Sequence, residues 1–314
     1  MEVAEKLQRF NSAALDDILG VPFKVLDQGF VRVVDYMGTD ESIVQAARVS
    51  YGKGTKKVSE DMGLIRYLLR HSHTTPLEMC VIKLHVKVPM DCWRQWIRHR
   101  MSSVNEYSTR YSEAIDACQQ TAPDEWRIQS KNNKQGSAGF MSGMDTCDGF
   151  TPEYFSEEER KFQQAARDLY ENRLKAGIAK EQARKDLPLS NYTEAYWKID
   201  LHNLLHFLSL RMDKHAQKEI RDYANVIGNE IVSKWVPFAW EAFNDYNFRR
   251  DALLLTSLDK HIIAQLARGN REGALTSATN YGWLERNEFG KLKGNRERQE
   301  FEDKATELGI ILPW

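Results

Sequence analysis

Residues 91–113 gather arginine, histidine and hydroxyl side chains in a pattern suited to binding an anion. Between Cys92 and Ser112 the segment carries a single acid, Glu106, against Arg94, Arg98, His99, Arg100 and Arg110. Guanidinium groups bind phosphate through paired hydrogen bonds, and serine, asparagine and backbone N–H groups complete such sites. Arginine at the end of a helix also interacts favourably with the helix dipole. The spacing therefore leaves two interpretations open, a site for a phosphate-bearing ligand and a solvated basic face.

A second cluster lies in DLHNLLHFLSLRMDKH, residues 200–215. His202 and His206 are four residues apart, so a helix places them on one face, and Asp200 adds a carboxylate of the kind that metal sites use. The leucine-rich surroundings instead favour packed or hydrogen-bonded histidines, and the HExxH glutamate of a metalloprotease is absent. Arg211 ends an apolar helix face, where a partly buried guanidinium generally faces an anion or a developing negative charge.

The composition limits the classes of function. The 314 residues suffice for one large domain or two modest ones. The formal net charge of −1 argues against nucleic-acid binding through bulk positive charge, so any anion site must be local. No window offers the roughly 18 apolar residues of a membrane helix. The four cysteines are far apart and form no CxxC pair, so we expect a cytoplasmic protein with reduced thiols and without nucleic-acid or membrane partners. These cysteines are Cys80, Cys92, Cys118 and Cys147.

Hydrophobic periodicity predicts the elements that position these residues. Residues 81–88 alternate apolar and polar side chains, which is typical of a half-buried strand. Asp40 and Asp200 are expected to cap the helices that follow them, and Ser156 with Glu159 has the pattern of a capping box. We expect strands at 31–37, 81–88 and 193–199, and helices at 40–50, 59–73, from 91 towards the arginines, 156–175, 179–187, 201–211 and 214–235.

Three further segments complete the predicted organisation. Residues 1–29 are expected to form an N-terminal arm, and the Gly-, Ser- and Asn-rich segment at about 118–150 a long loop insertion. Residues 251–314 are expected to form a helical extension of unknown role, with nine basic and ten acidic residues that cancel. Together the pattern favours an α+β fold, a central sheet flanked by long helices.

The motifs together resemble one known family. The segment RQWIRHRMSSVNEYSTRYS is similar to the signature of flavin-dependent thymidylate synthases, and AARVSYG, HTTPLE, LPL and LRMDKHAQKEI resemble that family at matching spacings over about residues 30–250. The resemblance implies that family's fold and the reductive methylation of dUMP to dTMP. Methylenetetrahydrofolate would supply the methylene and become tetrahydrofolate, and FAD reduced by NADPH would supply the hydride. A local basic cluster in a neutral protein suits that task.

The resemblance also implies roles for individual residues. Arg211 would be catalytic, since its fixed charge would stabilise the deprotonated pyrimidine but cannot act as a base near neutral pH. Ser108 would bind phosphate and would not act as a nucleophile. The dUMP site would comprise Gln95, Trp96, Ile97, Arg98, Glu106, Tyr107, Ser108, Thr109, Arg110, Arg184 and Arg211. The FAD site would comprise Ser50, His73, Thr75, Glu78, Arg98, His99, Arg100, Glu106, Asp200, His202 and His206, and no metal is implied.

The chain departs from several relatives on the adenine side of the FAD site. Met79 stands where they have histidine, and Asp200, His202 and His206 lie where they have asparagine or arginine nearby. An acid at position 200 could accept a hydrogen bond from ribose or adenine but would repel a phosphate. Relatives assemble as homotetramers with active sites shared between subunits, and the same assembly is expected here.

Three alternatives remain to be distinguished. A thymidylate synthase that attacks uracil with a cysteine needs a Pro-Cys-His context, which none of the four cysteines has. A nucleic-acid-binding module would use Trp93, Trp96, Tyr107 and Tyr111 as stacking platforms, but the overall charge is unsuited to it. A metal enzyme would use Asp200 with its two neighbouring histidines.

Overall fold

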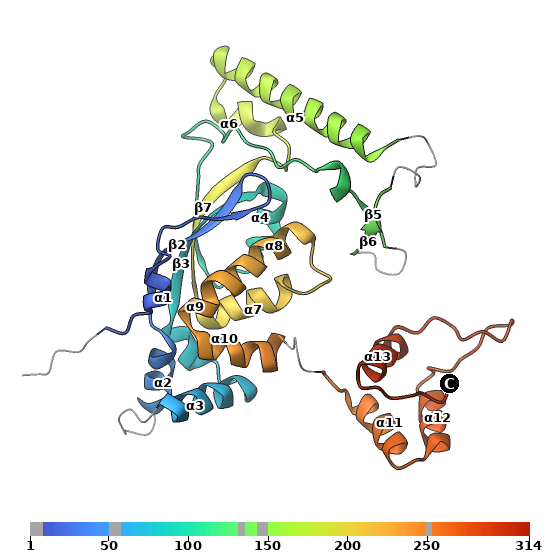
Figure 1. Cartoon of the computed structure of the whole chain (residues 1–314). Coiled ribbons are helices and arrows are strands. Elements are labelled where there is room, and N and C mark those ends of the chain that lie inside the picture. The colour runs from blue at the N-terminus through green and yellow to red at the C-terminus, as the bar shows by residue number, and fades with distance from the viewer. Residues whose placement is uncertain (1–8, 50–57, 131–135, 143–149, 249–252) are drawn as a thin grey trace, which may run out of the picture. The chain divides into compact units, whose positions relative to one another are not determined.

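The computed structural model describes residues 9–49, 58–130, 136–142, 150–248 and 253–314. The chain divides after Phe248 into two units, each with its own hydrophobic core (Figure 1). All of the expected site residues that the structure describes belong to the first unit.

An antiparallel sheet of five strands forms the centre of the first unit. Along β3 every second side chain from Ile82 to Val88 is buried, and the residues between them are only partly buried, so the predicted alternation is confirmed. β7 pairs with both β3 and β4, so it lies between these two strands in the sheet. In the order in which they pair, the strands are β1 (Phe23–Val25), β2 (Gly29–Met37), β3 (Val81–Pro89), β7 (Tyr192–Asp200) and β4 (Ser103–Glu106).

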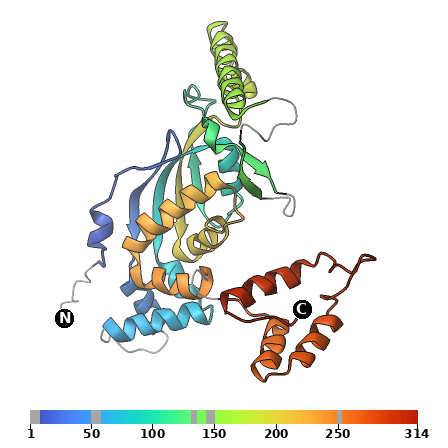
Figure 2. The same ribbon diagram turned by 45° about the vertical axis from the view of Figure 1, so that its right-hand side comes forward.

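Helices cover the buried face of the sheet. α4 packs on β3, α7 on β7, and α8 on β1 and β2, and Figure 2 shows α7 and α8, coloured gold to orange, in front of one face of the sheet. The helices of the first unit are α1 (Ala13–Asp16), α2 (Asp40–Val49), α3 (Val58–Arg70), α4 (Met90–Trp96), α5 (Pro152–Lys175), α6 (Lys180–Ala183), α7 (Leu201–Arg211), α8 (Lys218–Val226), α9 (Ser233–Trp235) and α10 (Pro237–Phe243). Short 3₁₀ turns occupy Thr75–Met79, Pro123–Glu125 and Arg184–Asp186, and π-helical turns occupy Ile227–Val232 and Asn244–Phe248.

Trp96 lies at the centre of this core and is fully buried. Its ring centroid lies 5.1 Å from that of Trp197 on the sheet and 5.0 Å from that of Phe207 on α7, and Tyr223 of α8 is 5.8 Å away. Large aromatic side chains contribute much of the burial energy of a core. The cluster therefore locks α4, α7 and α8 onto the sheet, and it fixes where the chain leaves α4 and α7.

The opposite face of the sheet is polar and partly exposed. Arg32 donates from Nε to Nδ1 of His85 at 3.0 Å, and Nε2 of His85 lies 2.9 Å from a carboxylate oxygen of Glu194. Because Nδ1 of His85 accepts a hydrogen bond, its Nε2 carries the proton and donates to Glu194. This chain of contacts crosses β2, β3 and β7 and sets their relative position from the solvent side.

The start of α5 differs from the prediction. The helix begins at Pro152, with Thr151 as its cap through a hydrogen bond from the Tyr154 N–H, so the capping box expected at Ser156 is wrong. Proline is favoured in the first helical turn because its fixed φ suits the helix and its missing N–H is not needed there. Ser156 instead donates to the Thr121 carbonyl at 2.7 Å, which ties the segment before α5 to the helix.

Four other elements also differ from expectation. β1 lies within the expected arm, yet it pairs with β2 as the edge of the sheet. The expected loop at 118–150 contains a hairpin of β5 (Arg127–Gln129) and β6 (Ser137–Phe140). The expected helix at 214–235 starts only at Lys218 and passes through a π-helical turn. Asp40 does not cap α2, because its carboxylate accepts the Phe238 and Ala239 N–H groups at the start of α10.

The second unit consists of α11 (Ser257–Ala267), α12 (Arg271–Asn280) and α13 (Arg296–Glu307), as the helical pattern suggested. Its core includes Trp283 and Phe301, both fully buried. A capping box at Thr256 and Asp259 opens α11, and Asp259 also pairs with Lys304 of α13 at 2.7 Å. None of the helices described in either unit is long and apolar enough to cross a membrane.

Candidate active site

The arginine-rich segment starts where α4 ends. α4 buries Trp93 and Trp96 in the core, so the chain that follows emerges at the surface. The His99 N–H donates to the Trp96 carbonyl at 3.0 Å, and the Ser102 hydroxyl donates to the His99 carbonyl at 3.0 Å. These bonds fix a turn that leaves His99 half-buried and leads the chain into β4.

Arg211 is hydrogen-bonded to His99, which comes from a distant part of the chain. Arg211 is the last residue of α7, and its half-buried guanidinium donates from Nε to Nε2 of His99 at 3.1 Å and from Nη2 to the Gln95 carbonyl at 3.4 Å. The pKa of His99 is lowered to about 4, first by burial and then by the charges of Arg211 and the nearby His206. The imidazole is therefore neutral near pH 7, with its proton on Nδ1. Burial also lowers the pKa of Arg211, although a guanidinium remains charged at neutral pH.

These residues line a cavity of about 570 Å³, which we call the Arg211 cavity. Among the residues described, no acidic side chain lines it, and neither Arg98 nor Arg100 has an ion pair with a residue of the described ranges. Ile199 and Leu210 give the same cavity an apolar wall. Low-dielectric walls beside unpaired cations focus a positive potential, so the cavity suits an anionic ligand that also has an apolar ring face.

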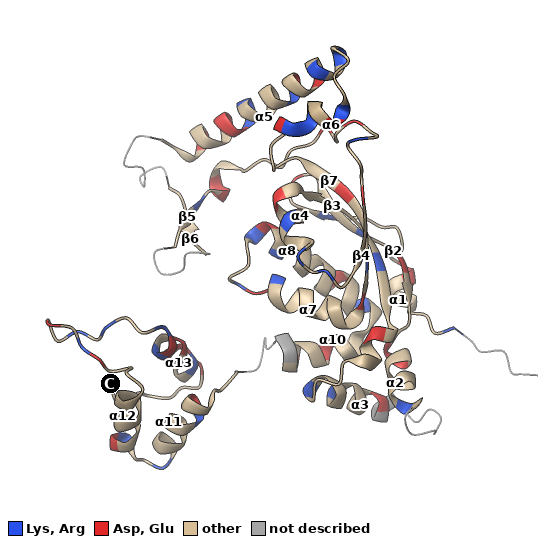
Figure 3. Cartoon of the chain, turned by 180° about the vertical axis from the view of Figure 1, so that it is seen from behind, with Lys and Arg blue, Asp and Glu red and all other residues tan. Residues whose placement is uncertain are grey.

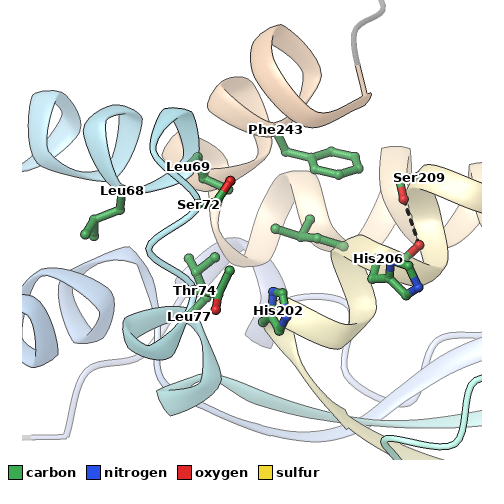
Figure 4. A pocket seen from close by; sticks show the side chains of 10 residues that line it. Leu68, Leu69, Ser72, Thr74, Leu77, His202, His206, Ser209 and Phe243 are labelled. Carbon is green, nitrogen blue, oxygen red and sulfur yellow. Dashed lines mark hydrogen bonds between the residues drawn. The ribbon is translucent and has the colours of Figure 1, made fainter.

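A second cavity, of about 130 Å³, adjoins the first because His206 lines both. We call it the His202 cavity. Figure 4 shows His202 of α7 near Thr74, which follows α3, and His206 further along α7 beside Ser209, with leucine side chains, Ser72 and Phe243 also around the cavity. The Ser209 hydroxyl donates to the His206 carbonyl at 2.8 Å (Figure 4). The two histidines expected at the FAD site are thus brought together.

A third cavity, of about 570 Å³, holds the other end of the expected dUMP site. We call it the Ser108 cavity. Ser108 lines it together with Glu106, whose carboxylate accepts hydrogen bonds from Trp93 Nε1 and Thr193 Oγ1, each at 2.9 Å. Arg184 enters from the turn after α6. Tyr107 and Thr109 also line it, and Thr109 accepts a hydrogen bond from Arg184.

Several expected site residues lie elsewhere. His73, Thr75 and Glu78 are exposed, and none of them lines the three cavities. The Asp200 carboxylate caps α7 by accepting the Asn203 N–H at 2.9 Å, as predicted. Ser50 lies outside the described residues. Within the described ranges, no group of three histidine, cysteine or acidic side chains is placed to hold a metal.

The expected dUMP residues also separate within one chain. Trp96 is fully buried in the core, Ile97 is exposed, and the Gln95 side chain is hydrogen-bonded to Gln217. Arg110 is exposed and lies 3.5 Å from Glu181. Arg98 and Arg211 line one cavity, whereas Ser108, Arg184 and their neighbours line another.

Sequence reasoning missed several residues that line these cavities, and four polar ones illustrate why. Ser72 and Thr74 belong to the His202 cavity, Asn203 to the Arg211 cavity and Arg94 to the Ser108 cavity. Arg94 was noted as a cation but was assigned no role. The other three are single polar residues whose spacing has no recognisable pattern, so only the fold reveals them.

Comparison with known proteins decides the family. A family described as "Thymidylate synthase complementing protein" matches residues 32–238, which is more than half of the chain. Flavin-dependent thymidylate synthases from Wolbachia pipientis wMel and Gluconobacter oxydans are 48% and 54% identical over 285 and 237 residues. These alignments cover 91% and 74% of this chain, and 95% and 76% of the relatives. The chain belongs to the flavin-dependent thymidylate synthase family.

The solved structures agree with this family. A UMP/dUMP methylase, PolB from Streptomyces cacaoi, bound with 5-Br dUMP, aligns with a TM-score of 0.63 at 28% identity. The alignment covers 72% of this chain and 99% of that protein. A second structure of PolB, bound with 5-Br UMP, aligns with a TM-score of 0.61 at 30% identity. The α+β fold expected for a flavin-dependent thymidylate synthase, a sheet flanked by helices, is thereby confirmed.

Proposed function

We propose that this chain catalyses the reductive methylation of dUMP to dTMP in the cytoplasm. Methylenetetrahydrofolate serves as the carbon donor and leaves as tetrahydrofolate, and NADPH reduces the FAD cofactor. The observation that carries the proposal is the Arg211 cavity, where a half-buried guanidinium and two exposed arginines face an apolar wall without an acid among the described lining residues.

The residues present fit FAD. A flavin combines an aromatic ring with a pyrophosphate, and the Arg211 cavity combines Ile199 and Leu210 with the cations Arg98 and Arg100, which form no ion pair with a described residue. His206 joins it to the His202 cavity, so the two together form one extended site. Arg98, Arg100, His99, His202 and His206 are the residues that would hold FAD. When bound, FAD reduced by NADPH supplies the hydride of the reaction.

Arg211 and His99 have different roles at the pyrimidine. The Arg211 guanidinium stabilises the negative charge that develops on the ring, as a preorganised cation does in a site that excludes water. His99 accepts the Nε hydrogen of Arg211 and so fixes the plane of the guanidinium. Because this bond occupies the only lone pair of a neutral imidazole, His99 positions Arg211 and does not act as the base.

Ser108, Arg110 and Arg184 bind the dUMP phosphate in this proposal. Ser108 and Arg184 line the Ser108 cavity, with Arg110 exposed nearby in the chain. Among the described residues, none lines both this cavity and the Arg211 cavity. A homotetramer in which one subunit supplies the phosphate-binding residues and another the Arg211 cavity would bring the two halves together, and we propose that assembly.

Attack on uracil by a cysteine is disfavoured among the cysteines that the structure describes. Burial raises the pKa of Cys80 to about 12 and also raises that of Cys92, which is fully buried. Burial likewise raises the pKa of Cys118. Since the thiolate is the nucleophile, none of these three is prepared to attack a ring.

An absorption experiment tests the proposal. The purified protein is titrated with FAD, and NADPH and dUMP are then added without oxygen. We expect stoichiometric flavin bands that bleach with NADPH, followed by dTMP formation once methylenetetrahydrofolate is supplied. A protein that takes up no FAD would refute the proposed enzymatic function. The nucleic-acid and metal alternatives would then remain, and salt-dependent oligonucleotide binding and metal analysis would distinguish them.

A further inference from the structure

A fourth cavity, of about 470 Å³, lies outside the sites described above, and we call it the Lys214 cavity. Its lining comes from the β5–β6 hairpin, from the loop after α7 and from the first turn of α8. The loop between α7 and α8 lies beside the hairpin in both views (Figure 1; Figure 3). The hairpin belongs to the segment at 118–150 for which the sequence predicted no structure.

The charged side chains that are described as lining this cavity are all positive. Lys214, Lys218, Arg221 and Arg127 line it, and no acid does so among the residues described. Arg127 is paired with Glu219 at 2.6 Å, and Lys218 is paired with Glu125 at 3.2 Å and with Asp222 at 3.0 Å. Lys214 and Arg221, in contrast, have no ion pair with any residue that the structure describes. Two uncompensated cations therefore face one concave surface.

Two of these ion pairs also build the cavity. Arg127 of the hairpin reaches Glu219 of α8, and Lys218 of α8 reaches Glu125 just before the hairpin. The hairpin segment and α8 thus each contribute one cation and one acid to these pairs, and the two pairs hold the hairpin against the helix. Both pairs are partly buried, so they are weakly screened by solvent. Arg221 donates to the Lys214 carbonyl at 2.7 Å and fixes the loop at the rim.

The Lys214 cavity is connected to the Arg211 cavity by hydrogen bonds. Gln217 lines the Lys214 cavity, and its side chain bonds to that of Gln95. The Gln95 carbonyl in turn accepts from Arg211 Nη2 at 3.4 Å. Lys214 also follows Arg211 by only three residues. These cations suit the tail of a ligand that reacts at Arg211 and carries a long anionic tail.

We propose that the Lys214 cavity binds the carboxylates of the glutamyl tail of the folate, an inference that rests on the proposed function. Among the proposed substrates, dUMP has its phosphate assigned to the Ser108 cavity, whereas the folate tail carries several separated carboxylates. Uncompensated cations on a loop and on a helix suit separated carboxylates better than one compact phosphate. The phosphates of NADPH are the other source of anionic charge, and the test separates the two.

The test compares folates that differ only in tail length. The Lys214→Gln/Arg221→Gln double variant is compared with the full-length wild type and with Lys24→Gln/Lys175→Gln, which removes two exposed cations without ion pairs to described residues elsewhere. Equilibrium dialysis with folic acid carrying one or five glutamates gives the dissociation constants of the FAD-loaded proteins. KM is measured for methylenetetrahydrofolate with the same two tails, for dUMP and for NADPH.

We expect the wild type and the Lys24→Gln/Lys175→Gln control to bind the pentaglutamate about tenfold more tightly than the monoglutamate, since two charge-assisted contacts are gained. The Lys214→Gln/Arg221→Gln variant should lose this preference and keep its KM for dUMP and NADPH. If the Lys214→Gln/Arg221→Gln variant differed from the wild type only in a raised KM for NADPH, the ligand would be a phosphate and the folate assignment would be wrong. If the variant kept its full preference for the pentaglutamate, the Lys214 cavity would not be the binding site. Dialysis needs no turnover, so a protein that prefers the long tail but makes no dTMP would refute the proposed function alone.

Discussion

Arg211 donates a hydrogen bond from Nε to Nε2 of His99 at 3.1 Å, although the two residues lie 112 positions apart in the chain. Arg211 is placed by the end of α7, and His99 by the turn after α4. Phe207 packs against the His99 ring with centroids 4.9 Å apart and also contacts Trp96 in the core. The pair is thus anchored to the aromatic core of the unit.

This contact predicts an unusual titration of His99. The pKa is lowered to about 4, first by burial and then by the charge of Arg211. We expect Arg211→Met to raise it towards, but not fully to, 6.5, because burial remains. The pH dependence of the His99 ring signals in NMR spectra measures this, with Arg271→Met as control. An identical midpoint in wild type and Arg211→Met would show that the guanidinium does not act on the ring.

Arg211→Ala should separate catalysis from cofactor binding. Removing the guanidinium takes away a charge that is aimed at the developing anion, so turnover should fall by about 10²-fold or more. FAD binding should be retained, because Arg98, Arg100 and the histidines remain. Turnover and flavin absorbance are measured on the same preparation. Turnover at the wild-type level would remove Arg211 from the mechanism.

Arg110→Ala should act mainly through affinity for dUMP. Loss of a charge-assisted contact to phosphate should weaken binding by about tenfold or more, with a smaller effect on turnover at saturation. Calorimetric titration with dUMP measures the affinity. Glu181→Gln is a matched control, because Glu181 lies 3.5 Å from Arg110 and its neutralisation should leave or slightly improve binding. Unchanged affinity in Arg110→Ala would exclude its phosphate role.

Asp40 predicts a pH dependence of stability. Burial raises the pKa of its carboxyl from 3.8 to about 7. The folded state therefore holds a proton that the unfolded state releases between about pH 4 and pH 7, so this carboxyl makes the free energy of unfolding fall as pH rises through that window. Asp40→Asn cannot titrate and should lack this contribution. His99 acts in the opposite direction over an overlapping range, since its lowered pKa makes stability rise with pH.

The difference between wild type and Asp40→Asn isolates the Asp40 contribution, because His99 is common to both. Urea unfolding at several pH values from 4 to 8 gives this difference. Asparagine offers one oxygen where Asp40 accepts two N–H groups, so a constant loss of stability is expected as well. A difference that does not change between pH 4 and pH 7 would contradict the raised pKa.

Truncation after Phe248 should leave a folded protein that binds flavin. The second unit has its own core around Trp283 and Phe301, and the cavities of the proposed active site are all lined by residues of the first unit. Gel filtration, thermal unfolding and FAD absorbance measure the outcome. A truncated protein that is insoluble or monomeric would show that residues 249–314 support the assembly.

The sequence predicted those features that depend on local chemistry. β3 was recognisable because its alternation has the period of a strand with one buried face, and Asp200 because a carboxylate before an apolar helix is a strong cap. The same rule was wrong at Ser156, where Thr151 caps the helix five residues earlier and Pro152 begins it. At Asp40 the acid did cap a helix, but one nearly 200 residues later in the chain.

The candidate site was predictable as a set of residues but not as an arrangement. The clusters around Arg98 and Arg211 are visible in the sequence because each is dense in unusual side chains. The two clusters come into contact because α4 and α7 pack on the same aromatic core and end close to each other. This tertiary packing cannot be read from the periodicity of either segment. The Lys214 cavity was missed for the same reason, since its cations are brought together by pairing between a hairpin and a helix.

The position of β7 determines when the site can assemble. β7 pairs with β3, which precedes it by more than 100 residues, and also with β4. During synthesis the first three strands can pair before the rest, but the sheet stays open until residue 200 has left the ribosome. Loop closure becomes costlier only slowly with length, by about 0.6 kcal/mol for each doubling. In terms of loop closure alone, the segment between β4 and β7 can therefore lengthen at little energetic cost, and this segment contains the hairpin that lines the Lys214 cavity.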